Sequence, residues 1–501
     1  MAKSELRIQY SGLIIFAAQL ISVATGFGFI LLLTRSTTTD EYGVWSNIFD
    51  VTGYFVLFSG LVPFWATRFV ARAKEGAART ALLANFVIGL AAAAVYISLV
   101  PSITAGLHIN NSYVPVYLLA SAQLTTVFLV SLLESCLRAR KPQAIGYGLL
   151  VEEVVKLSLA FILIVLLHPA TPALLFTYAM LSLIVSASVQ TLYYIRLLWN
   201  DLQLRARWSY IKEWLKGSAA ILYNAAGNQI GTYVFIMLFV YGSETARGDY
   251  QASATFAAII GYSLSLAFAL YPKLLAENSL HEITTSLRTV LLFAFPLAAI
   301  MIATSQSLLT VLKVAYSDAW PVLIVLALDA LIVLIMQFYT SVLYGIEKLD
   351  EEAKIPLRKL VKSRMFRLLS IPYLQAAITL PATFIILTRY TGETPVQAAT
   401  YVALILLFGH LVTLSVTGVI VGKVVRIDVP WQSTGKYALT SAITAIVLYL
   451  APHPRTLILT CATVVAGAAL YGAMTLLFDS YARNLVQQTL RELGRREPDE
   501  S

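Results

Sequence analysis

Long apolar segments constrain the fold of this chain more than any other feature of its sequence. Fourteen stretches are dominated by apolar residues, and most have the length of about 18–25 residues that a helix needs to cross the hydrocarbon core of a bilayer. They are 10–33, 44–66, 81–103, 113–134, 144–167, 173–198, 217–241, 249–271, 289–312, 320–345, 368–388, 397–421, 437–451 and 456–477. The sequence therefore predicts an all-α polytopic membrane protein with about 14 transmembrane helices. The thirteenth segment is the shortest, and the C-terminus changes sides if that segment does not cross.

The composition excludes several classes of protein. Of the 501 residues, 58% are hydrophobic and 13% are charged, whereas soluble domains carry about 25% charged residues. No phosphate-binding loop with the Gly-Lys-Ser/Thr ending occurs, and the five histidines show no metal-ligand spacing. Neither a cofactor nor a metal is therefore predicted. Cys136 and Cys461 fall in or beside apolar segments, which argues against a disulfide framework.

The distribution of lysine and arginine predicts the orientation in the membrane. With the N-terminus in the cytoplasm, the stretches predicted to be cytoplasmic hold thirty of the 36 basic residues, and Lys156 remains inside a segment. The other five lie in external loops: Arg35, Arg247, Lys313, Arg389 and Arg455. This alternation follows the positive-inside rule and accounts for the net charge of +9 without nucleic acid as a partner. It predicts a multi-pass protein of the cell membrane with both termini in the cytoplasm.

Two pairs of segments share a pattern at nearly the same distance along the chain. The matching residues are Tyr42/Tyr250, Gly53/Gly261 and Tyr54/Tyr262 at an offset of 208, and Phe128/Phe338, Ser131/Ser341 and Leu133/Leu343 at 210. Pro63 and Pro272 close the first pattern one residue out of step. Six predicted spans separate the copies, so both copies run in the same direction. The pattern predicts a parallel repeat related by an axis along the membrane normal.

Two segments rich in basic residues are predicted to lie at the cytoplasmic surface. In 199–216, tryptophan and tyrosine alternate with arginine and lysine, which favours an interfacial helix against membrane lipids over nucleic-acid binding. In 346–367, seven basic residues would attract anionic headgroups at about 1 kcal/mol each, or they form a charged solvated loop. The tail 479–501 is expected in the cytoplasm.

Two segments resemble one known family of membrane proteins. The stretch "LLTRSTTTDEYGVWSNIFDVTGYF", followed by "RFVAR" at 68–72, is similar to the opening of the polysaccharide-export flippases, and "SETARGDYQASATFAAIIGY" is similar to their eighth span. The resemblance extends from about 10 to 420. The same superfamily contains the lipid II flippases and the multidrug and toxin extrusion transporters. The resemblance implies two six-helix lobes, 1–198 and 217–421, around a central cavity, with 437–478 outside them.

The resemblance also implies a function. It implies a flippase that moves a prenyl-(di)phosphate-linked oligosaccharide from the cytoplasmic to the outer leaflet by alternating access. A cation-coupled multidrug or small-solute antiporter of the same superfamily is the alternative, although fourteen spans suit the flippase branches better than the usual twelve of drug exporters. A membrane enzyme such as a glycan polymerase or ligase would need a long external loop, and the external loops here reach only about ten residues. We therefore expect that the protein is not an enzyme.

A lipid-linked sugar needs a hydrated cavity with cationic and hydrogen-bonding groups, and polar residues inside spans are candidates for it. The candidates are Asn47, Asp50, Asn85, Gln123, Glu152, Glu153, Lys156, Gln190, Asn224, Asn228, Gln229, Asp329, Gln337 and Gln375. Asn47 and Asp50 are three apart and share a helix face, as do Asn224 and Asn228, which are four apart. We expect the three asparagines, Asn47, Asn224 and Asn228, to bind the substrate.

Glu152, Glu153 and Lys156 place three charges inside one span, where a charge at the bilayer centre costs about 2.5–3.5 kcal/mol. Their spacing puts both carboxylates beside the ammonium group on one helix face. Either they form an ion-paired cluster near the inner interface, or they line the cavity. In the second case Lys156 attracts phosphate, and the spare carboxylate binds H+ or Na+ for coupling.

The remaining candidates have two interpretations each. Asp50 and Asp329 either line the cavity as ion-coupling acids or make local helix contacts. Arg35, at the outer end of the first span, and Arg68, at the inner end of the second, either meet phosphate at the cavity mouths or anchor the helices at the interface. Asn110 begins an Asn-Asn-Ser acceptor pattern for N-glycosylation in a loop predicted to be external.

Overall fold

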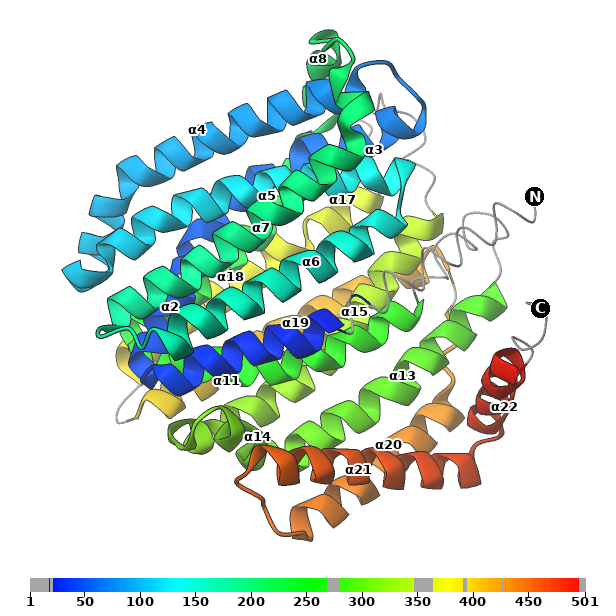
Figure 1. Cartoon of the computed structure of the whole chain (residues 1–501). Coiled ribbons are helices and arrows are strands. Elements are labelled where there is room, and N and C mark those ends of the chain that lie inside the picture. Colours follow the sequence, from blue (N-terminus) through cyan, green and yellow to red (C-terminus); the bar gives the residue numbers. More distant parts are fainter. Residues whose placement is uncertain are drawn as a thin grey trace, which may run out of the picture. The chain divides into compact units, whose positions relative to one another are not determined.

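In the computed structural model, every regular element of the described residues is a helix (Figure 1). The structure describes residues 18, 21–267, 280–346, 364–390, 394–425 and 427–494. Within these ranges, nine helices are long and apolar enough to cross a membrane. They are Thr39–Ala71, Ala77–Gly106, Asn111–Arg140, Pro172–Gln203, Ile283–Ala303, Val314–Leu343, Phe366–Arg389, Pro395–Gly422 and Leu457–Phe478. Each overlaps one of the fourteen predicted segments, which confirms an all-α multi-pass membrane protein.

The other five predicted segments are also helical where the structure describes them. They overlap the helix Ile21–Ser36, α6 (Gln143–Ala160), α9 (Ala219–Gly231) with α10 (Tyr233–Met237), α11 (Glu244–Gly261) and α20 (Trp431–Leu450). α20 begins six residues before the predicted start at 437. The prediction placed the start too late because the first turns of this helix are polar and do not count as an apolar segment. Its 20 residues span about 30 Å, which is the thickness of the hydrocarbon core.

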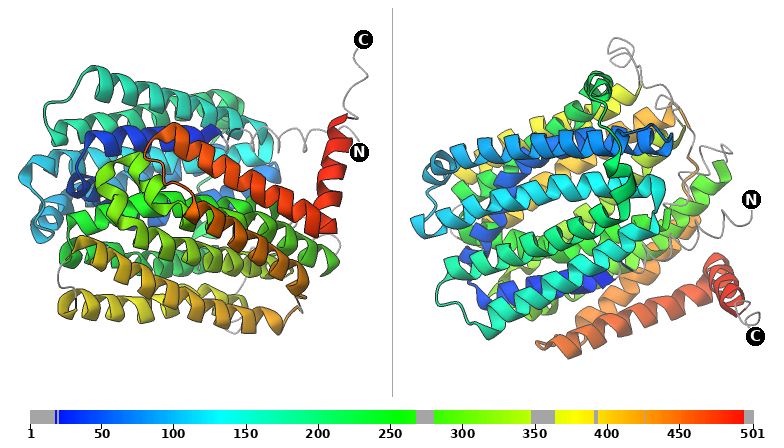
Figure 2. Two further views of the ribbon diagram at one scale, coloured as in Figure 1. Left: turned by 90° about the horizontal axis from the view of Figure 1, so that it is seen from below. Right: turned by 45° about the horizontal axis from the view of Figure 1, so that its top comes forward.

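The chain divides into two compact units, and each is described separately. Unit 1 comprises Met1–Gly248 and Glu352–Tyr390. Its longest helices are α4 (Ala77–Gly106), α5 (Val114–Arg140) and α7 (Pro172–Gln203). α5 packs against both α4 and α7, and α7 also packs against α6. Figures 1 and 2 show these four helices side by side.

Shorter helices complete unit 1. They are α2 (Thr39–Val56), α3 (Leu61–Ala71), α8 (Ser209–Gly217), α17 (Arg364–Leu369) and α18 (Ile371–Arg389). α2 and α3 pack against α5, and α18 packs against α9. α8 occupies part of the predicted interfacial segment 199–216 and contacts α3 and α4. It inserts Trp214 into the core of the unit, where the indole meets the Phe69 ring at 5.6 Å between centroids.

Unit 2 comprises Asp249–Glu351 and Thr391–Ser501. Besides α20 and part of α11, its helices are α13 (Leu280–Ala303), α14 (Ser305–Leu312), α15 (Trp320–Ile346), α19 (Pro395–Gly422), α21 (Leu457–Phe478) and α22 (Ser480–Gly494). α15 packs against α19, and α13 packs against α15 and α20. Asp479 accepts hydrogen bonds from Arg288 Nη2 and from the Tyr437 hydroxyl, both at 2.7 Å. These bonds join the last two long helices, α20 and α21, to α13.

The predicted repeat has a local counterpart in the backbone. α2 passes into a 3-10 turn at Leu57–Gly60, and α11 passes into a 3-10 turn at Tyr262–Ala267. The first turn begins three residues after Tyr54, whereas the second begins at Tyr262, the residue matched with Tyr54. Pro272 and most of the basic segment 346–367 lie outside the described residues. The lobe boundaries at 198 and 217 and the separate place of 437–478 stay predictions.

Candidate functional site

A pocket of about 440 Å³ lies in unit 1, between α2 with its following turn, α5 and α9. Its lining is Phe49, Thr52, Gly53, Val56, Leu57, Ala120, Gln123, Leu124, Val127, Ala225, Asn228 and Gln229. The polar groups are thus one hydroxyl and three amides, and among the described residues no charged side chain lines this pocket. Because amide groups both donate and accept hydrogen bonds, the pocket suits a neutral polar molecule.

The two predicted asparagines of α9 contact each other, and one of them lines this pocket. Asn228 is exposed, and its Nδ2 donates to Asn224 Oδ1 at 3.1 Å and to the Asn224 carbonyl at 3.0 Å. Asn224 Nδ2 lies 3.5 Å from the Leu369 carbonyl. The predicted shared face is therefore present, and Asn228 lines the pocket whereas Asn224 does not. The Tyr373 hydroxyl donates to the Tyr223 carbonyl at 2.7 Å, which anchors α9 to α18.

Asp50 forms a buried ion pair with Arg247, a residue that the sequence assigned only to an external loop. Arg247 Nε lies 2.7 Å from Asp50 Oδ2, and Nη2 lies 2.9 Å from Oδ1. The side chains are 4% and 9% exposed, and the guanidinium lies 5.0 Å from the centroid of the Phe235 ring. This bidentate geometry is the strong form of a charge-assisted hydrogen bond. Arg247 lies two residues before the predicted span 249–271. This position is the one feature of the sequence that indicates a place for Arg247 near the membrane.

The start of α11 contacts the start of α2 backbone to backbone. A Cβ atom on Gly43 would collide with the Glu244 carbonyl, and one on Gly248 would collide with the Thr39 carbonyl. Only glycine permits this approach at either position. The ion pair of Asp50 with Arg247 lies beside this crossing, and both features belong to unit 1.

Glu152, Glu153 and Lys156 are brought together as their spacing predicts. Lys156 Nζ lies 2.8 Å from Glu153 Oε1 and 3.5 Å from Glu152 Oε1. Glu153 also accepts hydrogen bonds from the Ser22 and Thr25 hydroxyls of the first described helix, both at 2.6 Å. Glu152 has the longest contact and the most exposed side chain of the three, at 18%. It is therefore the spare carboxylate of the cluster.

Sequence reasoning missed a further carboxylate in unit 1. Glu134 Oε1 accepts hydrogen bonds from the Tyr194 hydroxyl at 3.2 Å and from Gln190 Nε2 at 3.5 Å. Glu134 sits in the last turns of α5, where it appears in sequence to belong to the basic, interfacial end of a span. Its buried partners on α7 become visible only through the packing of α5 against α7.

Asp329 has a histidine as its partner within unit 2. Asp329 Oδ1 lies 2.7 Å from His410 Nδ1, and the side chains are 11% and 15% exposed. Asp329 belongs to α15 and His410 to α19, the two helices that pack most extensively in this unit. Of the four acids predicted within spans, Asp329 contacts a histidine, whereas Asp50 contacts an arginine and the two glutamates contact Lys156.

The other predicted residues lie apart from the pocket. Asn47 is fully buried, and its Oδ1 accepts a hydrogen bond from the Tyr117 hydroxyl at 2.7 Å, so a substrate contact would need α2 and α5 to separate. The Arg68 guanidinium stacks 3.7 Å from the centroid of the Phe64 ring. Arg35 is exposed. Asn110 is exposed, and its side chain accepts a hydrogen bond from the Ser112 backbone N–H at 3.0 Å.

Comparison with known proteins identifies the fold. No protein-family model matches the chain, and no curated protein matches it by sequence. A structure of the lipid II flippase MurJ in an inward closed conformation superposes with a TM-score of 0.61 at 14% identity, covering 93% of this chain and 99% of that one. An inward-facing multidrug resistance transporter of the MATE family, in the MOP superfamily, gives 0.61 at 11% identity, covering 82% and 98%. A MOP superfamily transporter from Pyrococcus furiosus gives 0.57 at 12% identity, covering 89% and 96%.

These neighbours are transporters and a flippase, and none of the three is described as an enzyme. Within the described residues, no group of three or more histidine, cysteine or acidic side chains is placed to hold a metal ion. The chain shares the fold of the MOP superfamily transporters.

Proposed function

We propose that the chain is a flippase that moves a prenyl-(di)phosphate-linked oligosaccharide from the cytoplasmic to the outer leaflet of the cell membrane by alternating access. The observation that carries the proposal is the uncharged, amide-lined pocket of unit 1. Sugar hydroxyls donate and accept hydrogen bonds, as the amides of Gln123, Asn228 and Gln229 do. A site for cationic drugs would instead gain from acidic side chains, because binding partners complement each other in charge.

The phosphate end of the substrate needs cations at the two membrane faces. Arg68 at the predicted inner end of α3 and Arg35 at the predicted outer end of the first helix are the candidates. Lys156 ranks behind them, because its ammonium group already contacts two carboxylates. Both termini are proposed to be cytoplasmic, which makes Arg68 the first contact and Arg35 the last.

Alternating access requires a closure that can open. We assign this role to the crossing of α2 and α11, where the two backbones touch and Asp50 pairs with Arg247. By the predicted topology, both helices begin at the external face. In the proposed lobes, 1–198 and 217–421, the two partners belong to different lobes. The ion pair would then hold the external side shut while substrate enters from the cytoplasm.

Two clusters are candidates for ion coupling. Glu152 is the spare acid beside Lys156, and Asp329 is paired with His410. A carboxylate inside a membrane favours binding of a proton or a metal cation, because an unpaired charge there is costly. H+ or Na+ is therefore the proposed coupling ion, if the transport is coupled.

A cation-coupled multidrug or small-solute antiporter is the second candidate. The observation that favours it is that a MATE-family transporter superposes as well as the lipid II flippase does, with the same TM-score of 0.61. The flippase covers 93% of this chain and that transporter 82%. The greater coverage supports the first candidate.

The two candidates differ in what the purified protein moves in proteoliposomes. We expect a fluorescent prenyl-diphosphate oligosaccharide to become accessible to a membrane-impermeant quencher faster than in protein-free vesicles. A cationic dye should not exchange faster under an H+ or Na+ gradient. The opposite result from folded protein, with dye moved and the lipid-linked sugar left in place, would replace the flippase by the antiporter.

A further inference from the structure

We propose that unit 2 holds an anionic phospholipid of the outer leaflet in a pocket between α13, α14, α15 and α20, with its phosphate at Arg455 and His453. The pocket is separate from the amide-lined pocket of unit 1, and its occupancy does not depend on what the chain transports. Four observations carry the proposal: an apolar cavity, a polar cavity that shares two residues with it, polar groups of the polar cavity that have no partner within the described residues, and aromatic residues that line the apolar cavity.

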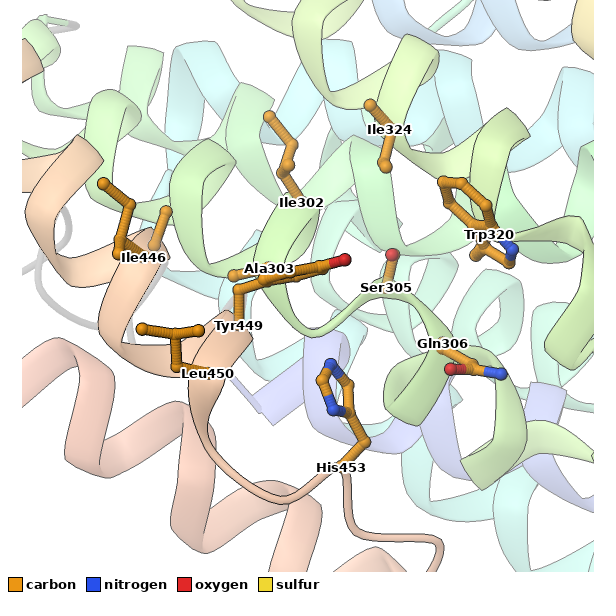
Figure 3. Close-up of a pocket in the computed structure, with 11 residues that line it drawn as sticks. Ile302, Ala303, Ser305, Gln306, Trp320, Ile324, Ile446, Tyr449, Leu450 and His453 are labelled. Carbon is orange, nitrogen blue, oxygen red and sulfur yellow. The ribbon is translucent and has the colours of Figure 1, made fainter.

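The apolar part of the site has room for an acyl chain. The cavity has a volume of about 510 Å³, within the range of about 300–1,000 Å³ typical of pockets for small ligands. Ile446 and Leu450 of α20 line one side, and Ile302 and Ile324 line another (Figure 3). Ile446 is 59% and Leu450 77% exposed, so these side chains on a membrane helix face lipid rather than protein.

The polar part adjoins the apolar part. A smaller cavity of about 160 Å³ shares Gln306 and His453 with the apolar one and adds Arg455. Figure 3 shows the polar ends of Ser305, Gln306 and His453 on one side of the pocket and Ile446 and Leu450 on the other. The two joined cavities are therefore apolar at one end and polar at the other, as a lipid molecule is.

Two polar groups at the polar end, Ser307 and Arg455, have no partner within the described residues. The Ser307 side chain is 2% exposed, yet its hydroxyl makes no hydrogen bond within the described residues. A buried hydroxyl without a partner is unfavourable. Arg455 is exposed, and no hydrogen bond or ion pair of its side chain occurs in the described part of the chain. A phosphate with its ester oxygens would supply an anion for Arg455 and an acceptor for Ser307.

The surroundings place the site at a membrane interface. Trp320 and Tyr449 line the pocket and are 45% and 68% exposed, and such aromatic side chains gather at the headgroup level of bilayers. The basic residues of the adjoining loops, Lys313 and Arg455, are predicted to be external. The site therefore faces the outer leaflet. A free phosphate would leave the apolar cavity unfilled, which favours a lipid as the occupant.

The test measures lipid affinity on the purified full chain by native mass spectrometry. The probes are phosphatidylglycerol and phosphatidylcholine with identical acyl chains. We expect phosphatidylglycerol to bind more tightly, and Arg455→Ala to weaken it about fivefold, equivalent to about 1 kcal/mol, without weakening phosphatidylcholine. The matched control is Arg389→Ala, an exposed arginine predicted on the same side but belonging to unit 1. It should leave both affinities unchanged.

A second variant tests the apolar end. Combined Ile446→Ala and Leu450→Ala should weaken both lipids to the same extent, and both side chains are too exposed for their loss to unfold the protein. Equal affinity for the two lipids in wild type and in Arg455→Ala would overturn the proposal. Displacement of phosphatidylglycerol by inorganic phosphate alone would also overturn it in favour of a simple anion site. Displacement by a prenyl diphosphate but not by excess phosphatidylcholine would assign the pocket to the transported molecule instead.

Discussion

Asp50 and Asp329 look alike in the sequence, because each is a single acid inside a predicted span. In unit 1, the Arg247 guanidinium holds Asp50 through contacts of 2.7 and 2.9 Å. In unit 2, His410 Nδ1 lies 2.7 Å from Asp329. A guanidinium keeps its charge at all physiological pH values, and it holds Asp50 through two contacts. The imidazole of His410 holds Asp329 through one contact.

The largest expected effect follows from removing the permanent cation. Arg247→Ala leaves Asp50 as a buried carboxylate without its partner, so the free energy of unfolding should fall by about 3–5 kcal/mol. Thermal unfolding of the protein in detergent measures it. Asp50→Asn combined with Arg247→Gln removes both charges and should restore most of the loss. A double variant as unstable as Arg247→Ala would show that the unpaired carboxylate is not the cause.

A smaller effect is expected at the neighbouring backbone crossing. Gly43→Ala introduces a Cβ that collides with the Glu244 backbone, so α2 and α11 must move apart, at a cost of about 1–3 kcal/mol. If this crossing closes the external side, a thiol introduced in the pocket, as in Ala225→Cys, should react faster with an external membrane-impermeant reagent in Gly43→Ala. Gly60→Ala is the control, because no atom lies within 4 Å of its added Cβ. Equal labelling in the two variants would rule out the crossing as a closure.

The smallest effect on stability is expected at the pair of Asp329 with His410. His410→Gln retains a side chain that can hydrogen-bond to Asp329, so the free energy of unfolding should change by less than about 1.5 kcal/mol. If this pair is the coupling site, transport driven by an H+ or Na+ gradient should be slower in His410→Gln than in wild type. His108→Gln, in an exposed loop, should keep the wild-type rate. A wild-type rate in His410→Gln would place ion coupling elsewhere.

Features that depend on neighbouring residues were predictable from the sequence. Hydropathy located the spans, because about 20 apolar residues form a helix of membrane length whatever surrounds them. The contacts of Lys156 with Glu152 and Glu153 follow from spacings of four and three along one helix. The early start of α20 at Trp431 was not predictable, because a polar first turn resembles a loop.

Features that depend on packing between distant helices were not predictable. Asp50 and Arg247 are 197 positions apart, and no local pattern pairs them. His410 lies within the predicted span 397–421, but nothing in the sequence places Asp329 beside it. Asn47 shares its helix face with Asp50, yet it is buried against Tyr117. Which amides share a pocket depends on how α2, α5 and α9 meet.

The central claim is that the amide-lined pocket binds the glycan during translocation. The most direct measurement is the transport rate of the fluorescent prenyl-diphosphate oligosaccharide by the combined variant Gln123→Ala and Asn228→Ala, beside Asn110→Ala as an exposed control. Loss of two hydrogen bonds of about 0.5–1.5 kcal/mol each predicts a rate at limiting substrate about fivefold lower or more, with unchanged thermal unfolding. Transport by the double variant at the rate of Asn110→Ala would contradict the claim and move the glycan path away from this pocket.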